Sequence, residues 1–250
     1  MKSLLTIIFL GLVIPAQAEW TLSFRKVIAT LSGGAEFVAR EAQQDGAAVR
    51  VQGVFFTTKQ AKFAVIDNPD RLPLGEVLPS LHMLAGTNGA YFHANGTPVG
   101  LQISAGTKVH PYETAKLLSG VFVVTKGVPR LVRSAKYTPS KYDGEALQCG
   151  PFLIENGQAI VGLNAVKSAR RTVVATDGSG KWALLIFSYA TLAETAGILA
   201  SGAVFPDFPV KQALNLDGGS STGLWVATEP KPFYLSEFGR VRNFLGILPR

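Results

Sequence analysis

The sequence predicts an α+β fold: a single, strand-rich, mixed-sheet domain with a few helices. Many short runs of apolar and β-branched residues are bounded by glycine, proline and asparagine, which is typical of strands joined by turns. Only 16% of the residues are charged and 26 are glycines, a composition suited to one large core. No repeat and no linker of biased composition divides residues 19–250, so we expect one domain there.

The first 18 residues have the three regions of an export signal. Lys2 supplies a positive charge, residues 4–14 form an apolar run, and Ala16-Gln17-Ala18 matches a small-x-small cleavage site. The apolar run is short for a membrane span. We therefore expect a signal peptide cut after Ala18 and a periplasmic or secreted protein that starts at Glu19, with no stable membrane insertion afterwards.

The first half of the domain shows alternating strand signals and one helix. Residues 49–57 and 61–67 flank a short polar turn and predict a β-hairpin. Residues 74–83 have helical spacing, although Pro79 has to kink or divide that helix. Two short strands are expected at residues 100–103 and 120–125.

The second half begins with a polar, basic stretch, residues 129–145, which we predict as a long surface loop. A buried strand should follow near residues 149–154, with Asn156-Gly157 as a hairpin turn after it. Residues 170–175 and 182–187 predict two strands joined by the glycine-rich turn between them.

One helix has clear boundaries, at residues 192–201. Thr191 and Glu194 form a T-x-x-E capping box at its start, and Gly202 is the expected stop. The chain then passes two prolines into the strand that precedes Asp217.

Charge and residue spacing exclude several classes of function. The net charge of +7 becomes +6 when Lys2 leaves with the signal peptide, and the basic residues are scattered rather than interleaved with aromatics. We therefore expect no nucleic-acid partner. The modest positive electrostatic field suits anionic small molecules or envelope polymers. The three histidines and Cys149 lack metal-ligand spacing, so no metal or other cofactor is predicted. A lone cysteine also forms no intramolecular disulfide.

The stretch Leu214-Asn215-Leu216-Asp217-Gly218-Gly219-Ser220-Ser221-Thr222 joins a strand to a turn suited to anion binding. Leu214 and Leu216 alternate as in a strand with one buried face. Gly218 and Gly219 let the backbone turn and approach a ligand closely. Asp217 should therefore lie at a strand end, with amides and hydroxyls behind it. An ordinary Asp-Gly turn fits the same residues.

Further polar turns strengthen the functional interpretation. Arg171 offers a rigid guanidinium suited to phosphate, although an ordinary surface arginine also fits its spacing. The polar motifs, in chain order, are Asn88-Gly89-Ala90-Tyr91-Phe92, Pro98-Val99-Gly100, Gly150-Pro151, Arg171-Thr172, residues 216–222 and Asn243. Together these motifs resemble those of the phosphodiester glycosidase family, and the resemblance spans nearly the whole chain after residue 49.

The resemblance implies a phosphodiester glycosidase-like domain over residues 19–250 that hydrolyses glycosyl phosphodiesters by C–O cleavage and releases the sugar. The implied catalytic residues are Asp217, as nucleophile or base at the sugar carbon, Arg171, which would hold the phosphate, and Asn88, which would orient substrate oxygens. Phosphate is already a good leaving group, so a second carboxylate is less necessary than in ordinary glycosidases. The implied substrate-binding residues are Gly89, Tyr91, His93, Thr172, Gly218, Gly219, Ser220, Ser221, Thr222 and Asn243.

The chain departs from the family's usual motifs at Ala90, Tyr91, His93, Ser220 and Arg242. Two alternatives therefore stay open. One is a non-catalytic envelope or carbohydrate-binding protein on the same scaffold, and the other is a phosphodiesterase that cleaves the P–O bond. The expected partner is a sugar phosphate or an envelope glycopolymer, and Tyr91 and Trp225 are candidates for stacking on sugar rings.

Overall fold

The computed structural model describes residues 19–250, so the expected signal peptide lies outside the described residues. Of these residues, 47% lie in strands and 11% in helices, which confirms a strand-rich domain but makes it predominantly β rather than clearly α+β. The strand pairings in this range are all antiparallel, so the sheets are not mixed as predicted. No helix between residues 19 and 250 is long and apolar enough to cross a membrane.

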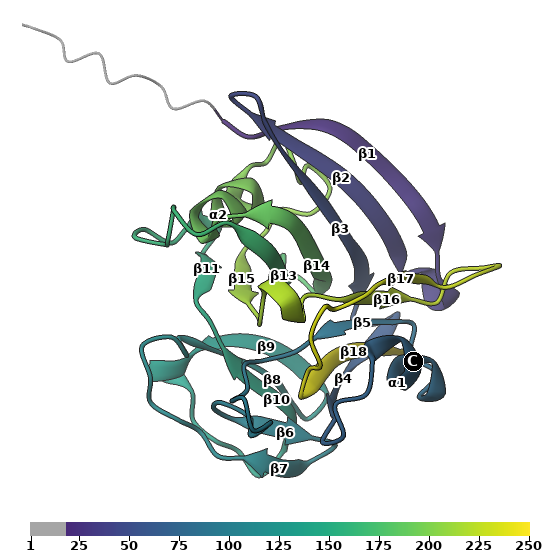
Figure 1. The fold of residues 1–250 in the computed structure, drawn as a ribbon, viewed down its shortest axis with the longest axis vertical. Helices are drawn as coiled ribbons and strands as arrows, with labels where there is room; N and C mark the ends of the chain where they lie inside the picture. Colours follow the sequence, from purple (N-terminus) through teal and green to yellow (C-terminus); the bar gives the residue numbers. More distant parts are fainter. Residues whose placement is uncertain (1–18) are drawn as a thin grey trace, which may run out of the picture.

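An eight-stranded sheet forms the largest layer, with the order β1-β2-β3-β14-β13-β15-β11-β12. Figure 1 shows it arching across the upper part of the molecule. Its strands are β1 (Thr21–Thr30), β2 (Glu36–Gln44), β3 (Ala47–Thr57), β11 (Phe152–Glu155), β12 (Gln158–Ala159), β13 (Ala169–Thr176), β14 (Lys181–Ala190) and β15 (Gln212–Asn215).

Two five-stranded sheets lie below it in Figure 1. The first has the order β7-β6-β10-β8-β9, with strands β6 (Gln102–Ser104), β7 (Thr107–His110), β8 (Gly120–Thr125), β9 (Val128–Arg133) and β10 (Asp143–Cys149). The second has the order β17-β16-β5-β18-β4, with strands β4 (Ala61–Asp67), β5 (Ala85–Asn88), β16 (Leu224–Val226), β17 (Phe233–Leu235) and β18 (Asn243–Pro249).

One core joins all three sheets, and its centre is aromatic. The ring of Phe63 on β4 lies 4.7 Å from that of Phe122 on β8 and 5.2 Å from that of Trp182 on β14, centroid to centroid. These tilted and edge-on contacts each add to the free energy of burying the rings, by about 1 kcal/mol. The three sheets therefore share one interior, which holds their strand ends in fixed relative positions.

The other face of the large sheet packs against α2 (Leu192–Ala200), whose Ile198 and Leu199 are buried against it. The predicted capping box is confirmed, because Thr191 accepts the N–H of Glu194 and Glu194 accepts that of Thr191. The other helix, α1 (Leu74–Ser80), covers the outer face of the second small sheet and ends one residue after Pro79.

Two sequence expectations about elements need correction, and two strands were missed. Strands β3 and β4 exist, but they form no hairpin, because β3 pairs with β2 and β14 while β4 pairs with β18 in another sheet. The predicted loop at 129–145 contains most of β9 and the start of β10, where pairing with β8 outweighs polar composition. Strands β1 and β2 were not predicted at all. The β11–β12 hairpin and the β13–β14 pair are confirmed.

Candidate functional site

The segment of residues 216–222, called the Asp217 turn below, lies where four strands of two sheets end. Asp217 donates its backbone N–H to the carbonyl of Gly89 at 3.0 Å, and Leu216 donates to the carbonyl of Thr172 at 2.8 Å. Gly89 donates in turn to the carbonyl of Asn243 at 2.9 Å. The ends of β5, β13, β15 and β18 therefore meet, and they bring together motifs that lie far apart in the sequence.

The carboxylate of Asp217 is half-buried in this junction. Its Oδ1 accepts the N–H of Gly218 at 2.9 Å. Burial raises the pKa of Asp217, and hydrogen bonds from Ser221 and Gly218 oppose the rise. Gly219 has φ of +62°, a left-handed conformation that favours glycine and lets the chain enter the 3-10 turn Gly219–Ser221. The turn thus presents a carboxylate with increased proton affinity.

Asn88 holds the centre of the junction and is fully buried. Its amide donates to the carbonyl of Asp217 at 2.7 Å, and its Oδ1 accepts the Thr172 hydroxyl at 2.7 Å and the Gly223 N–H at 3.2 Å. The Thr222 hydroxyl, also buried, lies 3.2 Å from that of Thr172. The side-chain amide of Asn88 therefore makes its hydrogen bonds inside the protein, where it positions the Asp217 turn.

Arg171 lies at the start of β13 and is only 9% exposed. Its Nε donates to the carbonyl of Ala190 at 2.9 Å, and its Nη2 donates to the carbonyl of Lys167. Its Nη1 lies toward Gly218, 4.0 Å from where a Cβ would stand at that position. Burial lowers the pKa of Arg171, yet a guanidinium keeps its charge at any physiological pH. The protein thus fixes two nitrogens and directs the third toward the Asp217 turn.

Arg170 is a site residue that the sequence interpretation missed. Its Nη2 donates to the carbonyls of Thr222 and Ser236, and its guanidinium carbon lies 4.3 Å from the ring centroid of Phe238. Its hydrogen bonds therefore link the Thr222 end of the Asp217 turn to Ser236. Adjacent residues of a strand normally face opposite sides, and a register shift lies between Ala169 and Arg171, where both arginines reach this turn.

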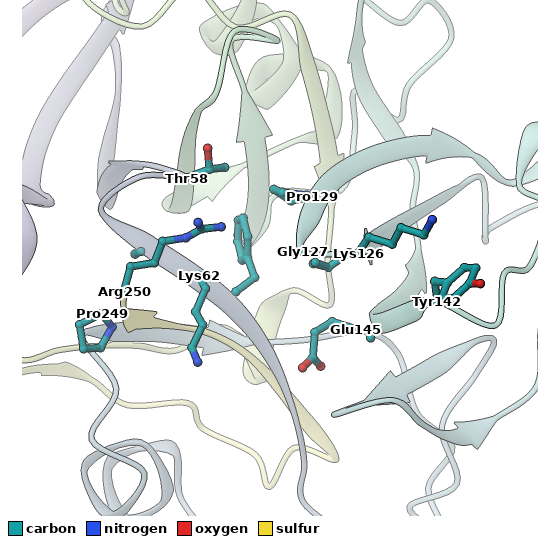
Figure 2. A pocket seen from close by; sticks show the side chains of 13 residues that line it. Thr58, Lys62, Lys126, Gly127, Pro129, Tyr142, Glu145, Pro249 and Arg250 are labelled. Atoms are coloured by element: carbon teal, nitrogen blue, oxygen red, sulfur yellow. The ribbon is translucent and has the colours of Figure 1, made fainter.

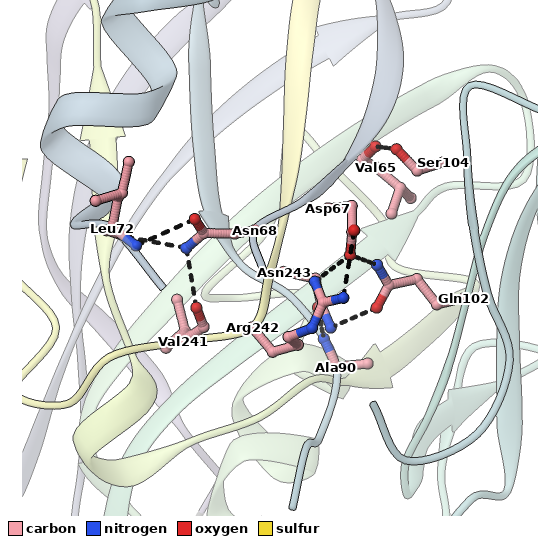
Figure 3. A network of polar contacts seen from close by, with 10 residues as sticks. All are labelled: Val65, Asp67, Asn68, Leu72, Ala90, Gln102, Ser104, Val241, Arg242 and Asn243. Carbon is pink, nitrogen blue, oxygen red and sulfur yellow. Dashed lines mark hydrogen bonds and ion pairs between the residues drawn. The ribbon is translucent and has the colours of Figure 1, made fainter. Parts of the chain in front are cut away.

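A polar network supports the Asn88-Gly89 turn from the other side (Figure 3). Asn243 accepts the N–H of Ala90 at 2.7 Å and donates to Gln102 at 3.0 Å. Gln102 donates to Asp67, which also pairs with Arg242. A Cβ on Gly89 would lie 2.1 Å from Oδ1 of Asn243, so this close approach requires glycine. Arg242, a departure from the family motif, thus has a structural role.

Tyr91 and Cys149 lie beside the site, but the Tyr91 hydroxyl is already hydrogen-bonded within the protein and Cys149 is enclosed by it. The hydroxyl of Tyr91 donates to the carbonyl of Gly150 at 2.5 Å and accepts the amide of Asn215 at 3.2 Å. Cys149 is fully buried. Burial raises the pKa of both groups, so both stay protonated at neutral pH.

Other predicted residues lie apart from the carboxylate or face elsewhere. His93 is exposed in a turn whose backbone bonds with Thr97, and no hydrogen bond in the described chain links it to the Asp217 turn. Ser220 is exposed at the rim, where its carbonyl accepts the N–H of Phe238 at 2.7 Å. Trp225 is only 6% exposed and packs beneath α1, so the expectation that it stacks on a sugar was wrong. Residues 19–250 contain no group of three or more His, Cys, Asp or Glu side chains arranged for a metal ion.

The sequence model of the phosphodiester glycosidases matches residues 82–248, which include Asn88, Arg171, Asp217 and Asn243. The chain belongs to the phosphodiester glycosidase family. This confirms the resemblance drawn from its motifs.

Solved structures share the fold of this family member at low sequence identity. The catalytic domain of zebrafish N-acetylglucosamine-1-phosphodiester alpha-N-acetylglucosaminidase, auto-inhibited by its pro-peptide, is 18% identical with a TM-score of 0.64, and the match covers 91% of this chain and 88% of that one. A hypothetical protein from Synechocystis is 16% identical with a TM-score of 0.63, covering 94% of this chain and 69% of that one. No match was found among curated proteins.

Proposed function

We propose that the protein is an exported hydrolase of glycosyl phosphodiesters that cleaves the bond between the anomeric carbon and the phosphate oxygen. Family membership supports this class of reaction. The observation that carries the proposal is the junction itself: a half-buried carboxylate of raised pKa, Asp217, in a turn toward which the fixed guanidinium of Arg171 is directed at Gly218. One group is suited to the sugar carbon and the other to the phosphate.

Hydrolysis adds the elements of water across one C–O bond. The oxygen of water ends on the sugar carbon, and the phosphate monoester leaves with the bonding electrons. Asp217 either attacks the carbon, and water then hydrolyses the glycosyl ester, or it removes a proton from the attacking water. Both routes require the ionised carboxylate, which burial makes more basic.

Arg171 would stabilise the negative charge that grows on the phosphate as it leaves. Its Nε and Nη2 are bonded to backbone carbonyls, so the guanidinium does not need to reorganise during the reaction. The backbone amide of Gly219 and the rim hydroxyl of Ser220 would supply further donors near the same turn, whereas the amide of Gly218 already donates to Asp217. Asn88 acts as a positioning residue, because its amide already bonds within the protein.

Hydrolysis of a sugar-1-phosphate diester in oxygen-18 water tests the proposal. We expect label in the released sugar and none in the phosphate. Label in the phosphate would show P–O cleavage and establish the phosphodiesterase alternative. Binding without turnover would establish the non-catalytic alternative. The configuration of the sugar first released, followed by NMR, separates the two roles of Asp217, since a nucleophile gives retention and a base gives inversion.

Export is the part of the proposal that rests on residues 1–18. Sequencing the mature protein from a periplasmic or culture fraction should give an N-terminus at Glu19. A soluble exported form that still begins at Met1 would contradict it.

A further inference from the structure

A basic groove lies at the ends of the strands away from the candidate site. It consists of two cavities of about 520 and 480 Å³ that share Thr58, Gly127, Pro129 and Arg250. Figure 2 shows the larger cavity, with Lys62 and Arg250 on one side and Lys126 on the other. Each volume is within the usual range of small-molecule sites.

The strands themselves connect the groove to the candidate site. Strand β18 begins with Asn243 in the site and ends with Pro249, which lines the larger cavity. Strand β13 carries Arg171 near its start and ends with Thr176, which lines the smaller cavity. Six residues of strand span about 20 Å. The groove is therefore a separate place on the molecule, outside the catalytic junction.

The groove carries five cationic side chains, of which only Lys62 has an acidic group, Glu145, near enough to influence it. None of them takes part in an ion pair among residues 19–250, whereas Arg25, Arg40, Arg133 and Arg242 all do. The five are Lys59, Lys62, Lys126, Arg130 and Arg250. Clustered like charges repel one another unless an anion neutralises them, so this surface is electrostatically complementary to a polyanion.

The one acidic side chain that lines the groove, Glu145, already accepts hydrogen bonds from the backbone. Glu145 accepts the backbone N–H groups of Val65 at 2.9 Å and Ala105 at 3.2 Å. Val65 lies on β4, an edge strand, so Glu145 satisfies a backbone donor that no neighbouring strand pairs. Burial raises the pKa of Glu145 and outweighs the opposing effects of these hydrogen bonds and of the charge of Lys62, so Glu145 neutralises the groove only in part.

The walls of the groove combine these charges with aromatic and apolar surface. Tyr142 is 51% exposed, and the ammonium of Lys126 lies 4.4 Å from its ring centroid. Pro129 lines both cavities, whereas Trp182 is only 3% exposed and belongs to the core beneath the smaller one. Aromatic faces bind the C–H faces of sugar rings, and adjacent ammonium groups bind the anionic substituents.

We propose that the basic groove binds an anionic glycan chain of the phosphodiester-linked type. The chain's phosphates would contact Lys62, Lys126 and their neighbours, and its sugar or polyol units would lie along the Tyr142 wall. The idea that this polymer is also the source of substrate rests on the proposed function. The two cavities share four lining residues, so a single flexible chain can run from one into the other.

The test measures binding of a poly(glycerol phosphate) chain by the full mature protein. The groove variant is Lys62→Glu with Lys126→Glu, and the control is Lys26→Glu with Lys116→Glu, exposed lysines outside the groove. Both pairs change the net charge equally. We expect the Kd of the groove variant to rise about tenfold or more and that of the control to rise less than about threefold, because two phosphate contacts are lost only in the first.

Several outcomes would overturn the proposal. Equal weakening of binding in both variants would show that the Kd depends only on net charge. Equally tight binding of neutral dextran would show that the phosphates do not contribute to recognition. Tighter, groove-dependent binding of duplex DNA or phosphatidylglycerol vesicles would assign the groove to another partner. Turnover of a small sugar-1-phosphate diester should be the same in the wild type and the groove variant. If the wild type lacks that turnover, the proposed function fails while the binding result still decides the groove.

Discussion

Asn88 donates its side-chain amide to the backbone carbonyl of Asp217 at 2.7 Å, across 129 positions of the sequence. The same side chain accepts the hydroxyl of Thr172, the neighbour of Arg171 on β13. Position 88 therefore needs a group that donates and accepts at once, which an amide does and a carboxylate does not. This one residue fixes the carboxylate-bearing turn relative to the strand of the guanidinium.

Asn88→Asp should weaken both folding and turnover. The substitution keeps the shape but removes the donor and places a buried carboxylate against the carbonyl of Asp217. We expect a loss of roughly 2–4 kcal/mol in the free energy of unfolding, measured by urea denaturation. Asn95→Asp is the matched control, because Asn95 is exposed and uses only its oxygen, toward the N–H of Thr97. Equal stability of the two variants would contradict the central position of Asn88.

Cys149→Ser should fold and retain turnover. Cys149 is fully buried and its pKa is raised, so the native protein presents a protonated thiol and no reactive thiolate. A buried hydroxyl in its place should cost about 1–3 kcal/mol of stability. A thiol reagent should label the wild type only after denaturation. Loss of turnover at an unchanged melting temperature would instead give the thiol a catalytic role.

The sequence predicts the motifs of the site because each is local. Asp217-Gly218-Gly219 and Asn88-Gly89 are turns whose glycines and polar side chains are visible in a few residues. Their meeting is not local, since it depends on β5 and β15 ending at one junction of two sheets. Only the family resemblance, which groups these turns into one set of motifs, indicates from the sequence that they act together.

The wrong and missing predictions concern strand pairing and side-chain contacts, which a local sequence pattern does not determine. Strands β3 and β4 look like a hairpin, but Thr58 donates to the carbonyl of Gly180 and the chain crosses into another sheet. Gln102 and Asp67 carry no sequence signal as supports of Asn243, because an isolated polar residue on a strand is common. Trp225 has an amphipathic ring, and only packing shows that α1 covers it.

Arg171→Lys should weaken phosphate recognition more than the retained charge suggests. A lysine cannot reproduce the bonds of Nε to Ala190 and Nη2 to Lys167 that hold the guanidinium in place. Inorganic phosphate should inhibit the wild type competitively, with an inhibition constant at least about tenfold higher in the variant. Arg50→Lys, at an exposed position on β3, is the control. Equal inhibition of the variant and the wild type would remove Arg171 from the site.

Asp217→Asn should abolish turnover and leave folding intact. Asn fits the same turn and can still accept the N–H of Gly218, so ligand binding should persist. We expect kcat to fall by roughly 10³–10⁴-fold, as when one member of a catalytic set is removed. Asp70→Asn, an exposed carboxylate on the turn after β4, should leave kcat unchanged. Near wild-type turnover would make Asp217 a turn residue only.

The raised pKa of Asp217 should also make activity and stability respond to pH in opposite directions. Because burial raises the folded pKa above the unfolded value, near 3.8, the carboxyl contributes stability below that value and loses the contribution as pH rises through the folded pKa. At neutral pH the ionised group therefore destabilises the fold, and Asp217→Asn should be more stable than the wild type. The difference should shrink as the pH falls toward the unfolded value.

Activity needs the ionised form, so the acid limb of kcat/KM should lie above the ordinary range of aspartate. Urea denaturation of both proteins across this pH range, beside the wild-type pH profile, measures both effects. A variant less stable than the wild type at neutral pH would show that the hydrogen bonds from Ser221 and Gly218 outweigh the burial of charge.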